Sequence, residues 1–223
     1  MAQMMRVVLT ASVGLALSGS LFAAAPTVST EDFVDKIDSP WDMAFMKDGA
    51  MFFTEKCKGL SVRLPSGAIN KLHGVGATTG YSSASADLFC DGQAGMMGVA
   101  IDPQFAGNRF IYVYSSSNLG GKLSNRVMRF KLNDAMTGVS DRTDIVADIG
   151  YKPKATKHPF GGPGAHNGGR IRFSPADGFL YVTTGDNHLG IGPQGPTYIG
   201  GKVLRIDRDG ISAKSLEGPL KDV

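Results

Sequence analysis

A histidine in a glycine-rich loop is the residue of this chain best suited to chemistry. His166 lies in the segment HPFGGPGAHNGGR, which runs from His158 to Arg170. Glycines let a backbone approach a ligand closely and adopt positive φ values. An imidazole titrates near neutral pH, so His166 suits a general base, although it could instead only hydrogen-bond a tight turn. His158, in the same loop, is expected to be a surface or turn residue.

A glutamine in the segment DGQAG is the second candidate. The amide of Gln93 can both donate and accept hydrogen bonds, which suits a group that faces two ligands at once. The alternative is a turn residue that caps the strand expected to start at Met96.

Three similar groups of strands are expected to position these residues. Each group has a strand of alternating apolar residues, a Pro or Asp-Gly turn and a second, aromatic-rich strand, followed by a third strand. The groups are WDMAF, MFFTE and LSVRL; MGVAI, FIYVYSS and RVMRFKL; and RIRF, LYVTT and KVLRID. Corresponding residues Met43, Val99 and Ile171 are about 56 and about 72 residues apart. In a chain with 30 glycines and 11 prolines, this repeat predicts an all-β fold and favours a β-propeller of about three blades over a β-sandwich.

Several longer motifs agree, in order and spacing, with one family of enzymes. They are PWDMAF, MFFTEKCKGLSVRL, LFCDGQAGMMGVAIDPQF, HNGGRIRF, LYVTTGDN and GGKVLRIDRDG, from about Ser39 to Gly210. Together they resemble the soluble PQQ-dependent sugar dehydrogenases, the glucose/sorbosone dehydrogenase family. The resemblance implies a six-bladed propeller, of which residues 26–223 would form roughly the N-terminal half.

The resemblance also implies a reaction, the oxidation of an aldose sugar at C1 to a lactone with hydride transfer to PQQ. His166 matches the family's general base, which also contacts the cofactor, and Gln93 matches a glutamine that contacts cofactor and substrate. Calcium is a further cofactor of the family. Its ligands and the cations that hold the quinone carboxylates come mostly from later blades, so we expect no metal ligand in this chain and no activity from it alone. The physiological sugar and the electron acceptor, a cytochrome or a quinone, are not identified by the sequence.

Residues near the base show one departure from the family pattern. Glucose-type members carry an acidic residue directly before the base, where this chain has Ala165, and the broader aldose branch therefore fits better. Arg170 and Asp186 are expected to be structural residues that pin adjacent blades. Asn187, as a substrate-binding residue, and His188 could reach the pocket.

The N-terminal residues 1–25 predict a cleaved signal peptide. Arg6 is the only charge before an apolar and small-residue run that ends in three alanines. A membrane anchor is the alternative, but the run is short for a span, so we expect no membrane span and a periplasmic or secreted protein.

The two cysteines and the charge distribution carry further expectations. In an exported protein, the even count favours a disulfide between Cys57 and Cys90 over two buried thiols. The net charge is only +3, and its Lys and Arg residues are scattered, so no nucleic-acid partner is expected.

Other functions fit the sequence less well. The main alternative is a non-catalytic exported propeller that binds a carbohydrate or a protein partner, because one fold can host both classes. A lactonase-like hydrolase would need a cluster of acidic metal ligands. The segment from Gly190 to Gly195, GIGPQG, matches a dinucleotide-binding pattern but precedes a strand rather than opening a helix. His73 lies in a poorly patterned region and is given no role.

Overall fold

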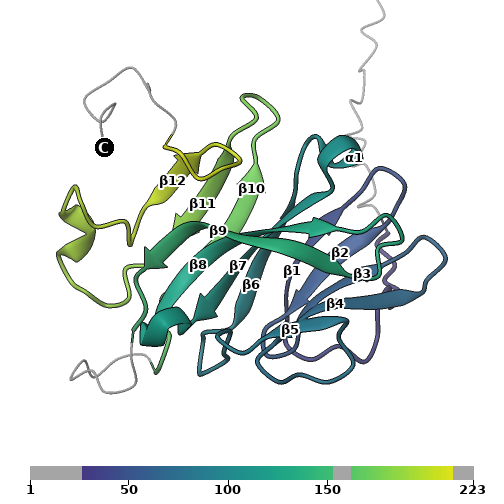
Figure 1. The fold of residues 1–223 in the computed structure, drawn as a ribbon, viewed down its shortest axis with the longest axis horizontal. Coiled ribbons are helices and arrows are strands. Elements are labelled where there is room, and N and C mark those ends of the chain that lie inside the picture. The colour runs from purple at the N-terminus through teal and green to yellow at the C-terminus, as the bar shows by residue number, and fades with distance from the viewer. Residues whose placement is uncertain (1–26, 153–161, 213–223) are drawn as a thin grey trace, which may run out of the picture. The chain divides into compact units, whose positions relative to one another are not determined.

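The computed structural model describes residues 27–152 and 162–212, and the chain divides into two units, residues 1–35 and 36–223. The described part of the first unit, residues 27–35, contains neither helix nor strand. The described part of the second unit contains twelve strands in three sheets (Figure 1). The expected signal peptide, residues 1–25, lies outside the described residues.

The three sheets follow one another along the chain. The first contains β1 (Pro40–Phe45), β2 (Met51–Glu55), β3 (Gly59–Arg63), β4 (Ile69–Val75) and β5 (Ser83–Ser85). The second contains β6 (Met96–Ile101), β7 (Phe110–Ser117), β8 (Ser124–Leu132) and β9 (Val139–Ile149). The third contains β10 (Gly168–Phe173), β11 (Leu180–Thr184) and β12 (Val203–Ile206). The described helices are short: α1 (Phe105–Asn108), η1 (Leu119–Gly121) and η2 (Gly192–Gln194).

Each sheet is an antiparallel meander in which neighbouring strands are consecutive in sequence, except that β5 pairs in parallel with β4. Short turns make this order possible. Between β1 and β2 the chain reverses at Asp48 and Gly49, where the aspartate side chain accepts a hydrogen bond from the Ala50 N–H at 3.0 Å and the glycine has a φ of 90°. The three groups of strands expected from the sequence are confirmed, and β4 and β9 extend the first two groups.

The middle sheet is buried on both faces, because successive side chains of a strand point to opposite sides. On β7, Ile111 and Val113 belong to one apolar cluster, with Phe52 and Leu60 of the first sheet. The alternate β7 residues, Tyr112 and Tyr114, belong to another cluster, with Leu180 and Val182 among the third-sheet residues. Apolar cores on both faces of the middle sheet are incompatible with a two-layer sandwich.

The first strands of the three sheets meet, with β6 in contact with both β1 and β10. A glycine permits the second approach, because a Cβ at Gly98 would lie 2.1 Å from the carbonyl oxygen of Gly169. Close packing of the backbones therefore sets the distance between β6 and β10.

A buried carboxylate joins the same three strands. The side chain of Asp42 on β1 is 1% exposed and accepts a hydrogen bond from the Val99 N–H of β6 at 3.0 Å. Arg172 of β10 donates to both carboxylate oxygens, at 2.8 and 2.7 Å, and Arg170 donates to one of them. Arg170 therefore has the structural role expected of it. We call Asp42, Arg170 and Arg172 the inner-strand ion cluster.

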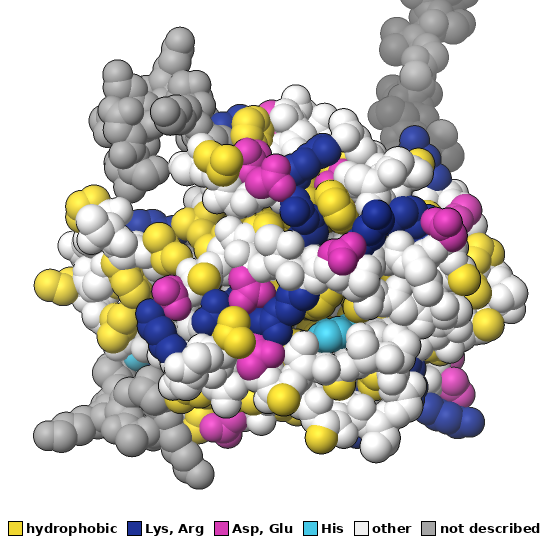
Figure 2. All heavy atoms as spheres, in the orientation of Figure 1, with side chains coloured by type: hydrophobic (Ala, Val, Ile, Leu, Met, Phe, Trp, Pro, Cys, Tyr) yellow, Lys and Arg dark blue, Asp and Glu magenta, His cyan; other side chains and the backbone are white. Residues whose placement is uncertain are grey.

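Charged side chains of both signs lie among one another on the face shown in Figure 2. Ion pairs join charged residues of the second sheet and of the loop before it: Arg142 pairs with Asp87 at 2.7 Å and with Asp144 at 2.9 Å. Within the part of the chain that the structure describes, no helix is long and apolar enough to cross a membrane.

Candidate active site at the His166 loop

A hollow of about 390 Å³ lies beside His166. It collects side chains from the start of β1, the turn after β2, the loop before β6, β6 itself and the loop before β10. Its lining residues are Trp41, Lys56, Gln93, Met97, His166, Asn167 and Gly168. Both leading candidates from the sequence, His166 and Gln93, therefore share one site, and the side chain of Gln93 accepts a hydrogen bond from the backbone N–H of His166 at 3.3 Å.

The backbone of the His166 loop has a conformation that few side chains adopt. His166 has a φ of 55°, in the left-handed region. Gly168 follows at 72°, and a Cβ there would lie 2.6 Å from the Thr183 carbonyl oxygen. The glycines thus let the loop turn tightly against β11 and present the histidine at the hollow. A strained backbone of this kind is common at functional sites.

Asn167 anchors the loop to the middle sheet. Its carbonyl oxygen accepts a hydrogen bond from the hydroxyl of Tyr114 at 2.8 Å, and its side-chain oxygen accepts one from Asn125 at 3.0 Å. Its amide also donates to the carbonyl of Gly164. Because Asn167 is buried, these bonds fix the backbone directly beside His166.

Asp186 orients the imidazole of His166. The Nδ1 atom lies 2.7 Å from Oδ1 of Asp186, and the two side chains are 50% and 40% exposed. The hydrogen bond from His166 is the largest cause that lowers the pKa of Asp186, so the carboxylate is ionised and only accepts. Nδ1 therefore carries the proton, which leaves Nε2 as the basic nitrogen. Asp186 pairs with His166 rather than with a neighbouring sheet, which differs from its expected role.

The two residues after Asp186 contact His166. The ring of His188 stacks on that of His166, with centroids 3.7 Å apart and planes 25° apart. Asn187 is buried, and its amide donates to the carbonyl oxygens of Ala165 at 3.3 Å and His166 at 3.1 Å. Asn187 does not line the hollow, and its contacts hold the loop in place. Its substrate-binding role stays a prediction.

The structure also shows where the other residues named from the sequence lie. Ala165 is fully buried, so the position before His166 presents no polar group to the hollow. Cys57 and Cys90 form the expected disulfide. His73 is buried on β4 between the hydroxyls of Ser83 and Ser85, while His158 lies outside the described residues. Among residues 27–152 and 162–212, no three His, Cys, Asp or Glu side chains are grouped so that they could hold a metal.

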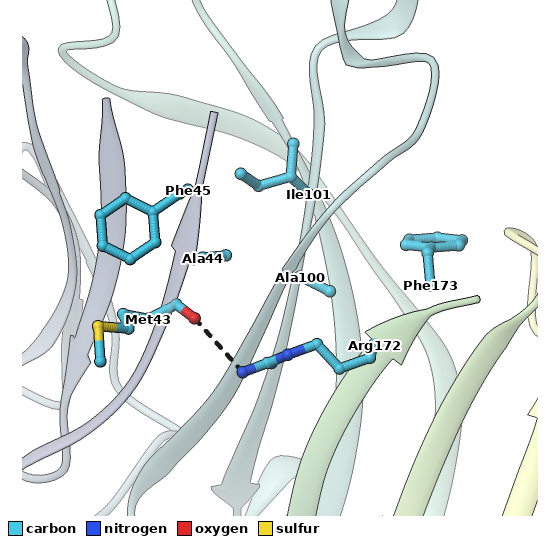
Figure 3. Close-up of a pocket in the computed structure, with 7 residues that line it drawn as sticks. All are labelled: Met43, Ala44, Phe45, Ala100, Ile101, Arg172 and Phe173. Atoms are coloured by element: carbon cyan, nitrogen blue, oxygen red, sulfur yellow. Dashed lines mark hydrogen bonds between the residues drawn. The ribbon is translucent and has the colours of Figure 1, made fainter. Parts of the chain in front are cut away.

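A second hollow lies toward the C-terminal ends of β1, β6 and β10 (Figure 3). Its lining is mainly apolar: Met43, Ala44, Phe45, Ala100, Ile101, Arg172 and Phe173. Arg172 is its one charged lining residue, and it donates to the Met43 carbonyl at 3.3 Å and to Asp42. This hollow therefore offers no general base, and the hollow beside His166 is the candidate active site.

The family model for Glucose / Sorbosone dehydrogenase matches residues 37–216. A curated relative, the aldose sugar dehydrogenase YliI of Escherichia coli K12, is 28% identical over 197 residues, which are 88% of this chain and 48% of the relative. The chain thus spans about half the length of this relative.

Solved structures of similar proteins support the same fold. A putative oxidoreductase (glucose dehydrogenase) from Thermus thermophilus is 29% identical with a TM-score of 0.64, over 82% of this chain and 48% of that one. The PQQ-bound aldose sugar dehydrogenase of Streptomyces coelicolor is 24% identical with a TM-score of 0.63, over 84% of this chain and 50% of that one. The all-β, propeller-type fold expected from the sequence is confirmed.

Proposed function

Because this chain belongs to the glucose/sorbosone dehydrogenase family, we propose that it contributes the base-bearing side of a PQQ-dependent aldose dehydrogenase. The relatives are about twice as long. We therefore propose that the chain acts together with a second half like theirs, and we call the two together the full-length protein. The single observation that carries the proposal is the His166–Asp186 pair, which lies next to Gln93 at one hollow.

The donor set of the hollow fits PQQ, a planar quinone with several carboxylates. Gln93 supplies an amide, Lys56 an ammonium, His166 an imidazole and Trp41 a flat aromatic ring. When bound, the quinone would accept the hydride that leaves C1 of the sugar. The described residues contain no metal cluster, so calcium would be held by residues outside this part of the chain, and no step is assigned to it.

His166 would act as the general base. Nε2 would take the proton of the anomeric hydroxyl while the C1–H bond breaks and C1 becomes the carbonyl carbon of a lactone. Asp186 would hold the ring in the tautomer that leaves Nε2 free and would stabilise the imidazolium that forms. Gln93 would contact both cofactor and sugar, because its amide has a donor and an acceptor. Asn187 would support the loop and contact the sugar.

A dye-linked assay tests this function directly. We expect the full-length protein, loaded with PQQ and calcium, to oxidise aldoses without NAD. Turnover that needs NAD and ignores PQQ would contradict the proposal. Sugar binding with no turnover under any of these conditions would support the non-catalytic binding propeller instead. The physiological electron acceptor, a cytochrome or a quinone, is then found by replacing the dye with each candidate acceptor in the same assay.

Residues 26–223 alone are proposed to be inactive. The resemblance places the calcium ligands and most of the cations that hold the quinone carboxylates outside this segment, and catalysis depends on holding reacting atoms in a near-attack geometry. We expect no turnover by purified residues 26–223 with excess PQQ and calcium, under conditions where the full-length protein is active. Clear cofactor-dependent turnover by this segment would show that it binds and orients the quinone without a second half.

We propose export as the cellular context. The Cys57–Cys90 disulfide supports it, because disulfides persist in oxidising compartments. Mass spectrometry of the mature protein should find a new N-terminus near residue 26 in the periplasm or medium. An intact residue 1 in the cytoplasmic fraction would contradict export.

A further inference from the structure

Lys56 is a lining residue of the hollow that the proposed function counts in the donor set but to which it assigns no contact. It lies in the turn between β2 and β3, and it shares the hollow with Gln93 and His166. It lies in the motif MFFTEKCKGLSVRL, in which the sequence predicts a role only for Cys57. An inference about Lys56 rests on the proposed function, since it concerns the ligand that this hollow takes.

The surroundings of Lys56 hold it in place. Its carbonyl oxygen accepts a hydrogen bond from the Met96 N–H at 2.8 Å. Gly95 packs so closely against it that a Cβ at Gly95 would lie 2.3 Å from this oxygen and 2.6 Å from the Lys56 Cγ. The next residue, Cys57, is tied by its disulfide to Cys90, in the loop that carries Gln93. The backbone of Lys56 is therefore held firmly at the edge of the hollow.

The charge of Lys56 is not balanced by a carboxylate. Its Nζ donates to the Gly92 carbonyl oxygen at 2.6 Å, and among the described residues no acidic side chain forms an ion pair with it. An ammonium has three donors, so two remain after this bond. Arg170 and Arg172 do not line this hollow, and both pair with the one carboxylate of Asp42. Among the described residues that line this hollow, Lys56 is therefore the one whose side chain brings a full positive charge to a ligand.

We propose that the ammonium of Lys56 binds an anionic oxygen of the quinone. A neutral aldose presents only hydroxyl groups, which a glutamine and a histidine can bind without a full positive charge. A cation that no carboxylate of the described residues pairs with favours an anion, and the carboxylates of PQQ supply one. A sugar acid has the same chemistry, and the experiment below distinguishes the two sources.

Equilibrium dialysis of PQQ against the apo form of the full-length protein measures the contact without turnover. Lys56→Gln should raise the Kd for PQQ by about tenfold, the loss expected for a charge-assisted hydrogen bond. The Kd of this variant should also depend less on salt concentration than that of the unchanged protein. Lys56→Arg, which keeps the charge, should stay closer to the unchanged protein than Lys56→Gln does.

Lys58 provides a matched control. It lies two residues away in the same turn, is exposed and does not line the hollow. Lys58→Gln removes the same charge, so it should leave the Kd for PQQ unchanged. If both substitutions weaken PQQ binding equally, Lys56 acts only through long-range electrostatics, and the proposed contact is wrong.

The remaining outcomes separate this inference from the proposed function. If Lys56→Gln binds PQQ normally but raises the KM for the sugar, the ammonium contacts the substrate, and the assignment to the quinone is wrong. If neither Kd nor KM changes, Lys56 only supports the Gly92 carbonyl, and the inference is again wrong. If the unchanged protein does not bind PQQ at all, the proposed function itself fails.

Discussion

His166 and His73 carry the same side chain in opposite surroundings. The side chain of His166 is half exposed at a hollow and hydrogen-bonds the ionised Asp186 at 2.7 Å. His73 is 5% exposed and lies between two neutral hydroxyls, with Nδ1 2.8 Å from Ser83 Oγ and Nε2 2.9 Å from Ser85 Oγ. Burial, reinforced by the positive charge of Arg142, lowers the pKa of His73 to about 4, although Asp87 opposes the shift.

The difference shows what separates a candidate base from a structural histidine. A base must take up a proton and still be stabilised afterwards, which a carboxylate at Nδ1 and a half-exposed ring allow. The pocket of His73 penalises the charged form, so this ring serves as a neutral member of the core, packed 4.7 Å from the ring of Phe130. Residue type alone does not reveal this difference. The charged residues that flank His73 and His166 in the sequence also show no pattern that would distinguish the two.

The largest expected effect comes from removing the candidate base. His166→Ala in the full-length protein should lower kcat by about 10²–10⁴-fold, the usual contribution of a general base. Thermal melting should stay close to that of the unchanged protein, because the side chain is half exposed. His73→Gln is the matched control, and it should retain turnover. A His166→Ala protein with nearly unchanged kcat would reduce His166 to a turn residue.

The next effect concerns the stability of the His73 region in acid. Above pH 6.5 His73 is neutral in both states. Between pH 6.5 and 4 only the unfolded chain takes up the proton, so the free energy of unfolding should fall as the pH falls and should level off below about pH 4. The loss should amount to about 3 kcal/mol, at 1.36 kcal/mol for each unit of pKa difference.

Denaturant unfolding at several pH values measures this loss. The titration of other groups is removed by subtraction of the same curve for His73→Gln, which cannot take up a proton. If both proteins lose stability equally between pH 6.5 and 4, burial does not keep His73 neutral and the comparison of the two histidines fails.

The smallest effect comes from neutralising the partner of the base. Asp186→Asn keeps an oxygen that can accept the Nδ1 proton but loses the charge that stabilises the imidazolium. A charge-assisted hydrogen bond is roughly twice as strong as a neutral one, so kcat should fall by about tenfold. Asp177→Asn, at an exposed carboxylate that pairs with Arg205 in the third sheet, is the control and should leave kcat unchanged. An Asp186→Asn protein with full activity would assign the carboxylate a structural role only.

The sequence predicted the fold where side chains follow a simple period. The alternating apolar residues identified β1–β3, β6–β8 and β10–β12. The strand β9 was not identified, because its segment VSDRTDIVADI is mostly half-buried or exposed and carries charges at irregular spacing. β4 was missed for a similar reason, since its first residues are exposed and its buried half contains His73.

The site was predicted only as far as local patterns reach. His166 and Gln93 stand in glycine-rich segments that favour close approach of a ligand, and the disulfide followed from the even cysteine count. The partnership of His166 with Asp186 spans 20 residues and that of Asp42 with Arg172 spans 130. Such pairs form only where the fold brings two strand ends together. Their separation along the chain follows no periodic pattern that a single sequence would reveal.

The inner-strand ion cluster has a consequence for how the molecule unfolds. Proteins built from similar consecutive units can lose them one at a time, because each unit contacts only its neighbours. Here one carboxylate accepts hydrogen bonds from β1, β6 and β10, so detaching any of these strands would leave a buried charge with fewer partners. Backbone amides of the three sheets should therefore exchange with deuterium in a single cooperative opening, even though the sheets are separate in the sequence.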